Sequence, residues 1–208
     1  MNKAKLYYVH DPMCAWCWGY QPAWQAIEQT LVQKVDPNIE IVYLVGGLAP
    51  DSNEPMPAEM QRQIRSYWQK IEDYLGTQFN YDFWSNNTPR RSTYPACRAV
   101  LAAREQGAEK AMIRAIQEAY YLRALNPSDL EVLVRLAQEL KLDSERFSQQ
   151  MQSTHLNRTL LEEISFARSI GGNSFPSLFV EREGNLQELP IDYDNPRSTL
   201  NLIDEICR

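Results

Sequence analysis

The hydrophobic and polar positions along the chain divide it into three parts, of which the first predicts a strand–helix–strand unit. Residues 6–10 and 39–45 are short runs rich in branched and aromatic residues, which is typical of buried strands. Between them, apolar residues recur three and four positions apart over residues 16–34, as on one face of a helix. A turn is expected at residues 36–38, where a proline interrupts the pattern.

The second part of the pattern is helical. Gly46 and Gly47 end the second predicted strand, and three prolines between residues 48 and 57 indicate a loop. Amphipathic periodicity, punctuated by glycine and proline, then predicts helices at residues 58–75, 95–106, 108–122, 126–140, 143–151 and 156–170.

Strand character returns in the third part. Residues 177–181 and 186–189 have strand character and flank a Glu-Gly-Asn sequence, which predicts a hairpin. Pro196 then opens a last helix that is expected to end near Cys207.

This order of elements predicts an α/β protein whose single sheet is assembled from both ends of the chain. We expect one domain formed by residues 1–50 and 156–208, and an all-helical insertion domain formed by residues 51–155. The insertion is expected to form a lobe over one side of the sheet. A chain of 208 residues is long enough for one domain with an insertion of this size.

Composition and charge exclude several classes of partner. The net charge is −6 and the only adjacent basic pair is Arg90-Arg91, so no nucleic-acid partner is expected. No run approaches the roughly 18 apolar residues of a membrane span, so no membrane partner is expected. The N-terminus lacks the apolar run of an export signal, so with Met1 as the natural start we expect a cytoplasmic protein.

The four cysteines bring redox chemistry into the picture. They are too few for a disulfide scaffold, but Cys14 and Cys17 form a Cys-x-x-Cys motif at the start of the first predicted helix. Unpaired N–H groups and positive potential at a helix N-terminus stabilise a thiolate. We therefore expect Cys14 to be the exposed nucleophile and Cys17, one turn further in, to resolve the mixed disulfide.

The cysteine pair also has interpretations other than redox chemistry. A structural zinc site needs four ligands, and the remaining soft ligands, at positions 10, 97, 155 and 207, form no second close pair. We therefore expect no metal and no cofactor beyond the cysteine pair itself, with glutathione or another thiol system as electron partner. The interpretation of Cys14 and Cys17 as a pair of inert core cysteines stays open.

Two candidate substrate-binding features accompany the motif. If the Phe175–Pro176 bond is cis, the backbone of Phe175 would lie beside Cys14 and pair with a substrate peptide; a trans proline that merely starts a strand is the alternative. Trp16, between the two cysteines, either offers an apolar docking surface for unfolded peptide or packs against the helical lobe.

Two further residues have both a functional and a structural interpretation, and two more have only a structural one. His10 ends the first strand and either tunes the thiolate or is a satisfied structural residue. Cys97 is either a regulatory thiol or a small buried hydrophobe. Cys207 is expected to be incidental, and Asp11 to be a turn residue before a proline.

A family resemblance rests on five stretches in register along nearly the whole chain. These are Asp11-Pro12-Met13-Cys14-Ala15-Trp16-Cys17-Trp18-Gly19, Gly46-Gly47-Leu48, Pro95-Ala96-Cys97-Arg98-Ala99-Val100, Ile116-Gln117-Glu118-Ala119-Tyr120-Tyr121 and Phe175-Pro176-Ser177-Leu178. Together they resemble the DsbA-family thioredoxin-fold proteins, and most closely the cytoplasmic FrnE-like branch. The first and last stretches are specific in combination, whereas the helical ones are weaker alone.

The resemblance implies a thioredoxin-like fold (βαβ … αββα) with an inserted helical domain, a cis proline at position 176, and disulfide exchange on proteins or small thiols. Exported DsbA proteins usually carry Pro-His between their cysteines, whereas this chain has Ala15-Trp16. The thiolate therefore lacks a histidine partner within the motif, and a strongly oxidising protein is not expected.

Two other function classes stay open. Kappa-class glutathione transferases and chromene-carboxylate isomerases share the inserted-helix layout, but they generally work without the resolving cysteine, so Cys17 argues against them. The other class is a chaperone-like, peptide-binding module with an idle motif. The primary prediction is a protein disulfide oxidoreductase, isomerase or reductase.

Overall fold

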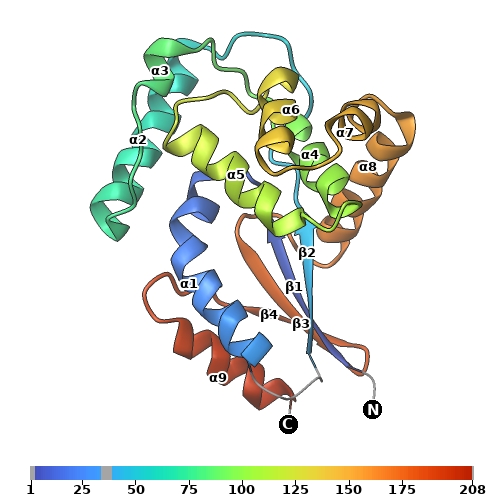
Figure 1. The fold of residues 1–208 in the computed structure, drawn as a ribbon. Coiled ribbons are helices and arrows are strands. Elements are labelled where there is room, and N and C mark those ends of the chain that lie inside the picture. Colours follow the sequence, from blue (N-terminus) through green and yellow to red (C-terminus); the bar gives the residue numbers. More distant parts are fainter. Residues whose placement is uncertain (1–2, 34–38, 208) are drawn as a thin grey trace.

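The computed structural model describes residues 3–33 and 39–207 (Figure 1). The turn expected at residues 36–38 lies outside this part of the chain. In order, the elements are β1 (Ala4–His10), α1 (Ala15–Gln33), β2 (Ile39–Val45), α2 (Ala58–Leu75), α3 (Phe83–Asn86), α4 (Tyr94–Arg104), α5 (Glu109–Tyr121), α6 (Leu130–Glu139), α7 (Ser144–Met151), α8 (Thr154–Ser169), β3 (Ser177–Arg182), β4 (Asn185–Leu189) and α9 (Pro196–Cys207).

The four strands form one sheet in the order β2-β1-β3-β4. β1 and β2 are parallel, because the crossover through α1 returns the chain in the same direction. β3 runs antiparallel to both β1 and β4. Both ends of the chain therefore build the same sheet, which confirms the α/β class and the βαβ … αββα order.

Alternation along β1 sends its side chains to two layers of helices. Leu6 and Tyr8 belong to the larger apolar core, on the face that α1 and α9 cover. Tyr7 and Val9 point to the opposite face, where Ala167 of α8 joins them in a smaller core. The first and last helices thus pack together on one face of the sheet, and α8 covers the other.

The helices α2 to α7 form a lobe at the end of the sheet where β1 and β2 finish (Figure 1). We expected this lobe over one side of the sheet. It lies beyond the strand ends because the chain continues past Val45 through a loop before α2 begins. The apolar core is continuous between the two regions, since Tyr8 and Trp24 belong to the same cluster as Val100 and Leu133. The domain boundaries at residues 50 and 155 stay a prediction.

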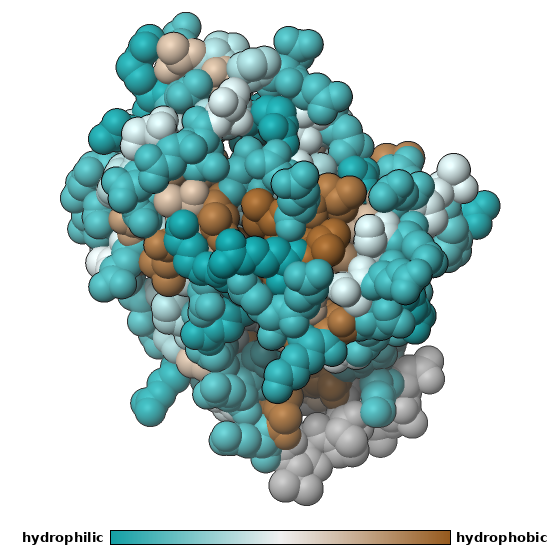
Figure 2. Space-filling model, turned by 45° about the horizontal axis from the view of Figure 1, so that its top comes forward, coloured by the Kyte–Doolittle hydropathy of each residue, from teal (hydrophilic) through white to brown (hydrophobic). Residues whose placement is uncertain are grey.

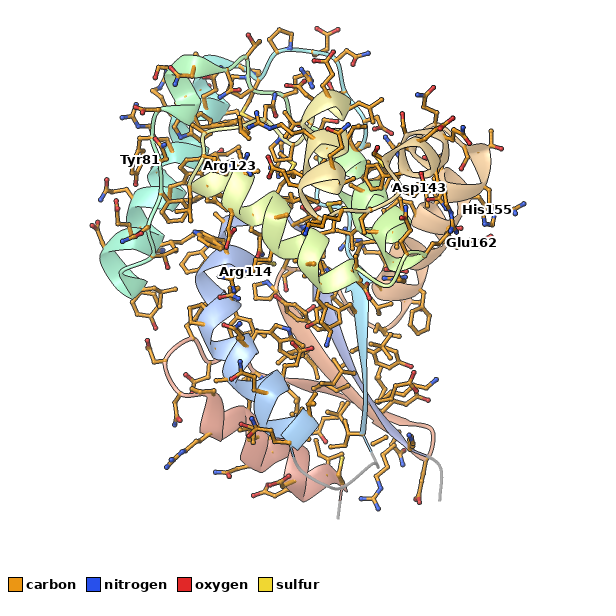
Figure 3. The ribbon with its side chains drawn as sticks, in the orientation of Figure 1. Tyr81, Arg114, Arg123, Asp143, His155 and Glu162 are labelled. Atoms are coloured by element: carbon orange, nitrogen blue, oxygen red, sulfur yellow. The ribbon has the colours of Figure 1, made fainter. Side chains whose placement is uncertain are left out.

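The surface of the lobe is mainly hydrophilic. Figure 2 shows one face with polar residues over most of its area and a smaller group of apolar side chains near its centre. Charged residues such as Arg114 on α5 and Arg123, just beyond its end, lie at the outside of the lobe (Figure 3). Within the described ranges, no helix is long and apolar enough to cross a membrane.

Two helical details differ from the sequence-based expectations. The helix α3 was not predicted, because four residues are too few to show a helical period. The helix α6 begins at Leu130 and not at residue 126. The side-chain oxygen of Asn126 instead accepts the backbone N–H of Ser128 (3.2 Å), which stabilises a turn ahead of the helix.

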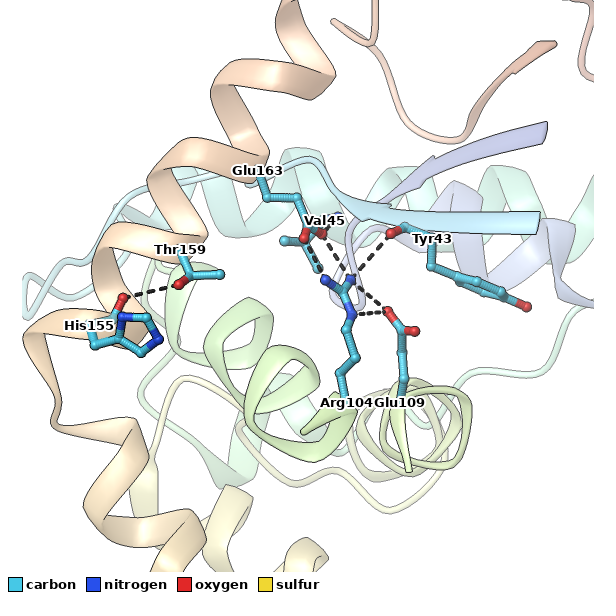
Figure 4. Close-up of polar contacts among 7 residues, drawn as sticks. All are labelled: Tyr43, Val45, Arg104, Glu109, His155, Thr159 and Glu163. Atoms are coloured by element: carbon cyan, nitrogen blue, oxygen red, sulfur yellow. Dashed lines mark hydrogen bonds and ion pairs between the residues drawn. The ribbon is translucent and has the colours of Figure 1, made fainter. Parts of the chain in front are cut away.

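An arginine joins the lobe to the sheet (Figure 4). Arg104 of α4 donates to both carboxylate oxygens of Glu163 on α8 (2.6 and 3.0 Å) and to the backbone carbonyl of Tyr43 on β2 (3.2 Å). Its third partner is Glu109, at 2.8 Å. Glu163 also accepts the backbone N–H of Val45 (2.7 Å), so one ion-pair network ties α4 and α8 to the end of β2.

Candidate active site

The two motif cysteines lie at the first turn of α1 with different exposure. The backbone N–H of Cys14 donates to Asp11 (3.0 Å) in the turn that follows β1, and the Cys14 carbonyl accepts from Trp18 (3.1 Å) as the helix begins. Cys14 therefore caps the helix, where the helix dipole favours negative charge. Cys14 is only 7% exposed and is therefore buried, so the expectation of an exposed nucleophile was wrong; the loop of Phe175 packs against its thiol. Cys17 is fully buried. Both are free thiols.

Burial separates the two thiols chemically. The pKa of Cys17 is raised well above its ordinary value, chiefly by desolvation and next by its hydrogen bond to Cys14. The backbone N–H of Asp11, directed at the same sulfur, opposes this shift. A thiol held in this way stays protonated until a reaction at Cys14 changes its surroundings.

The loop before β3 lies directly against the first cysteine. The thiol of Cys14 donates to the backbone carbonyl of Phe175 at 3.5 Å. The Phe175–Pro176 peptide bond is cis. Residues separated by 161 positions in the chain are thus in contact at the end of α1.

Two residues outside the loop position Phe175. A Cβ atom at Gly46 would lie 1.8 Å from the Phe175 ring, so only glycine leaves room for this ring at the end of β2. The Arg168 guanidinium stacks on the Phe175 ring, 5.0 Å from the ring centroid. Arg168 also donates to the carbonyls of Gly172 (2.6 Å) and Gly46 (3.0 Å), which ties the end of α8 to this loop.

Asp11 is the residue whose importance the sequence analysis missed. We expected a turn residue, but its carboxylate is fully buried at the end of β1. One oxygen accepts the backbone N–H of Met13 (2.8 Å). The other accepts from the Leu48 backbone (2.7 Å), the Thr93 hydroxyl (2.6 Å) and the Cys97 thiol (3.5 Å).

The Asp11 carboxylate therefore joins the motif turn, the loop after β2 and the start of α4. Desolvation raises its pKa, and the hydrogen bonds from Thr93, Leu48, Met13 and Cys97 act against that shift. An acidic residue at the end of an apolar strand, three positions before Cys14, was the signal in the sequence that could have identified this buried group.

His10 lies within an aromatic group. Its ring stacks on Tyr8 (centroids 5.2 Å apart) and meets Tyr43 edge-on (5.9 Å). It is fully buried, and neither ring nitrogen has a hydrogen-bond partner among the described residues. Desolvation, with a smaller contribution from Arg104, lowers its pKa to about 3, so the ring is neutral near pH 7. A role of His10 in tuning the Cys14 thiolate stays a prediction. A neutral imidazole carries no charge that would stabilise this thiolate.

An open cavity of about 260 Å³ lies beside Cys14. Trp16 lines it, and its ring meets that of Tyr193, in the segment before α9, edge-on at 5.5 Å. A substrate-docking role for Trp16 stays a prediction. The remaining wall comes from α2, the loops around residues 48–56 and 90–93, and the Phe175 loop. The predicted substrate-binding residues Trp16 and Phe175 thus share one cavity with Cys14.

The other cysteines lie apart from this contact. Cys97 is fully buried, and its thiol is a hydrogen-bond donor to Asp11. Burial raises its pKa well above the ordinary value. Cys207 lies at the end of α9. A redox role for Cys97 stays a prediction.

The described residues offer no group of three or more His, Cys, Asp or Glu side chains arranged to hold a metal ion. His155, the second histidine of the sequence, lies on α8 at the outer side of the lobe (Figure 3). It is therefore remote from the first turn of α1, where the cysteine pair lies.

Known proteins of similar sequence show the family of this chain. A family model described as Thioredoxin matches residues 7–192. Two curated relatives, each named ClpXP adapter protein SpxH, come from Halalkalibacterium halodurans and Bacillus subtilis, and both are 24% identical to this chain. The matches cover 88% and 84% of this chain but only 60% and 57% of the relatives, so this chain spans less than two thirds of their length.

Solved structures show the same fold over nearly the full chain. A Nitrosomonas europaea protein assigned by name as a protein disulfide isomerase is 27% identical, with a TM-score of 0.81 and coverage of 98% of this chain and 97% of that chain. The cytosolic disulfide reductase DsbM from Pseudomonas aeruginosa is 24% identical, with a TM-score of 0.78 and coverage of 97% and 99%. A second structure of DsbM, with GSH, has a TM-score of 0.75.

Proposed function

Since this chain belongs to the thioredoxin family and has a DsbA-like fold, we propose that it is a thiol–disulfide oxidoreductase whose Cys14–Cys17 pair reduces disulfides. The observation that carries the proposal is the contact of Cys14 with the Phe175 carbonyl, above a fully buried Cys17 and beside an open cavity. A nucleophilic thiol, a shielded second thiol and an adjacent free volume for substrate are what thiol–disulfide exchange requires.

The reaction takes two exchange steps. The thiolate of Cys14 attacks one sulfur of the substrate disulfide, so that the substrate S–S bond breaks, a Cys14–substrate disulfide forms, and the first substrate thiolate leaves and takes up a proton. Cys17 then loses its proton and attacks the Cys14 sulfur. The second substrate thiolate leaves, and the Cys14–Cys17 disulfide remains. Two electrons have passed from the cysteine pair to the substrate.

Regeneration is the same sequence in reverse, with glutathione or another thiol as reductant. The names of two neighbours, a cytosolic disulfide reductase and its complex with GSH, support this choice of partner and a cytoplasmic location. Membership in the FrnE-like branch is a further part of the proposal, which rests on the motif stretches of the sequence.

A trapping experiment tests the proposal. Reduced wild-type protein is mixed with glutathione disulfide, and the products are separated and weighed by mass spectrometry. Cys17→Ser should accumulate glutathione on Cys14, because the resolving thiol is gone, and Cys14→Ser should lose exchange by more than about 100-fold. Cys207→Ser is the matched control and should react like the wild type.

An inactive wild type, or a Cys14→Ser variant with full activity, would reject the enzymatic proposal. Such a result would favour the protein-binding alternative, which is the activity in the name of the two curated relatives.

The electrostatics of the site support a reducing direction. Asp11 places a buried carboxyl next to the pair, and His10 is neutral, so neither of these two buried groups stabilises a thiolate. We expect a reduction potential of roughly −170 to −250 mV, well below the approximately −120 mV of a strong oxidant. Equilibration with glutathione buffers measures it, and a value above about −140 mV would contradict this direction.

A further inference from the structure

The cavity beside Cys14 carries a charge pattern that its redox chemistry does not require. The whole chain has a net charge of −6, yet no aspartate or glutamate lines this cavity. Among the described residues, the only charged ones on its wall are Arg90 and Arg91. A cavity of positive sign in an acidic protein is suited to a negatively charged ligand.

The two arginines have different partners. Arg90 is engaged, because its guanidinium forms an ion pair with Asp129 just before α6. Arg91 is half-buried and has no ion pair or hydrogen bond among the residues that the structure describes. Its charge is felt by Tyr120, another residue of the cavity wall, whose raised pKa it partly lowers. Arg91 is therefore a cation with all of its N–H donors available on the wall that Cys14 shares.

The cavity wall also has an aromatic and apolar part. Trp68 of α2 belongs to it and is fully buried. The rest of the wall includes apolar side chains, among them Met56 and Ile64, which suit the carbon skeleton of a ligand.

We propose that this cavity is a subsite for a small anionic disulfide, such as glutathione disulfide, in which Arg91 binds a ligand carboxylate while Cys14 attacks the ligand sulfur. This inference rests on the proposed function and adds the substrate class. The cavity has a volume of about 260 Å³, near the lower end of the roughly 300–1,000 Å³ of small-molecule sites, so it holds part of such a ligand while the rest extends through the open mouth. Arg91 is a specificity-determining residue in this arrangement.

The test compares three small disulfides of different charge: glutathione disulfide, neutral 2-hydroxyethyl disulfide and cationic cystamine. Their rates of reduction by reduced protein are each divided by the rate with free dithiothreitol, which removes differences in intrinsic reactivity. The wild type should prefer the anionic over the neutral disulfide. Arg91→Gln should reduce this preference by roughly tenfold, since a charge-assisted hydrogen bond is lost. Arg91→Lys should retain most of it, and Arg91→Glu should favour cystamine.

Arg62→Gln is the matched control. Arg62 is exposed on α2 and lines a different depression, so its replacement removes the same charge without touching the cavity. Its preference for glutathione disulfide should match that of the wild type. An equal loss in Arg62→Gln and Arg91→Gln would show a general charge effect and overturn the subsite.

The remaining outcomes separate this inference from the proposed function. A wild type that reduces all three disulfides without preference overturns the anionic subsite and leaves the exchange activity intact. A fall in Arg91→Gln that is the same for all three disulfides also overturns it, because a damaged fold lowers every rate alike. A wild type that reduces none of them rejects the proposed function itself.

Discussion

At the scale of single residues, a difference in exposure makes two cysteines of one motif chemically distinct. Cys14 lies at the helix cap, where it is 7% exposed and lines the open cavity, whereas Cys17 is fully buried and does not line it. Burial disfavours the charged form of a thiol, and the thiolate is the form that reacts. The order of attack therefore follows from the positions of the two residues on the first turn of the helix.

We predict that iodoacetamide labels Cys14 at least about tenfold faster than Cys17 in reduced protein at pH 7. The reason is the raised pKa and full burial of the Cys17 thiol. Peptide mapping of briefly alkylated protein measures both sites in one sample. Faster labelling of Cys17 would reverse the proposed roles.

His10 should make stability depend on pH. Its pKa falls from 6.5 to about 3 on folding because the buried ring resists protonation. The unfolded chain thus binds a proton that the native state does not. The contribution of His10 to the free energy of unfolding is therefore fully present above pH 6.5 and is lost as the pH falls toward 3. Between pH 6.5 and 5 the wild type should lose about 2 kcal/mol relative to His10→Phe, at about 1.4 kcal/mol per pH unit.

Urea unfolding at the two pH values measures this difference. The matched control is His155→Phe, at a histidine exposed on α8, which should keep the pH dependence of the wild type. The same loss of stability in His10→Phe as in the wild type would contradict the burial of a neutral imidazole. The alkylation rate of Cys14 in His10→Phe tests whether this ring also tunes the thiolate.

At the scale of elements, the site is a meeting of three segment ends: the start of α1, the end of β2 and the loop before β3. Phe175 belongs to the last of these, and its ring fills the space that Gly46 leaves at the second. Arg168 closes the contact from the end of α8. The elements therefore place the Phe175 carbonyl at Cys14 through packing at Gly46, and not through local sequence alone.

Gly46→Ala should destabilise the protein by about 1–3 kcal/mol, because its methyl group would overlap the Phe175 ring. The double variant Gly46→Ala/Phe175→Ala removes the overlap and should lose less stability than the sum of the two single variants. Urea titrations of the four proteins give the coupling. Additive losses would show that Phe175 is not what restricts position 46.

At the scale of the whole molecule, lobe and sheet share one apolar core and one ion-pair network. Arg104 extends from α4 to Glu163 on α8 and to the backbone of β2 (Figure 4). Because the cavity beside Cys14 is walled by both regions, their relative position sets its shape. Contacts that fix the lobe on the sheet are therefore contacts that maintain the site.

Arg104→Met should destabilise the fold by about 2 kcal/mol. The change leaves the Glu163 side chain, 10% exposed, without its cation; full burial of a pair would cost more, but Arg104 is 35% exposed and partly screened. Arg114→Met is the control, since its pair with Glu118 lies at the surface, and it should change stability by less than about 0.5 kcal/mol. Thermal or urea unfolding compares them, and equal effects would contradict the bridging role of Arg104.

The sequence by itself determined the order of elements and the chemistry of the motif. The period of apolar residues is a local property, so the strands at both ends, most helices between them and the helix that begins after Cys14 could be predicted from it. The spacing of Cys14 and Cys17 is equally local, and so is the prediction of which thiol lies deeper. A four-residue helix and the turn at Asn126 escaped because their signals are shorter than a helical period.

Only the tertiary structure decided which distant residues meet. Asp11 looked like a turn residue, but burial at the end of β1 makes its carboxylate an acceptor for groups 37 to 86 positions away. The fold places Arg91 on the wall of the cavity beside Cys14, where it has no ion pair with any described residue. Its neighbour Arg90 forms an ion pair with Asp129. Pairing, burial and charge balance depend on contacts between segments far apart in the chain, and a one-dimensional pattern carries no information on those distances.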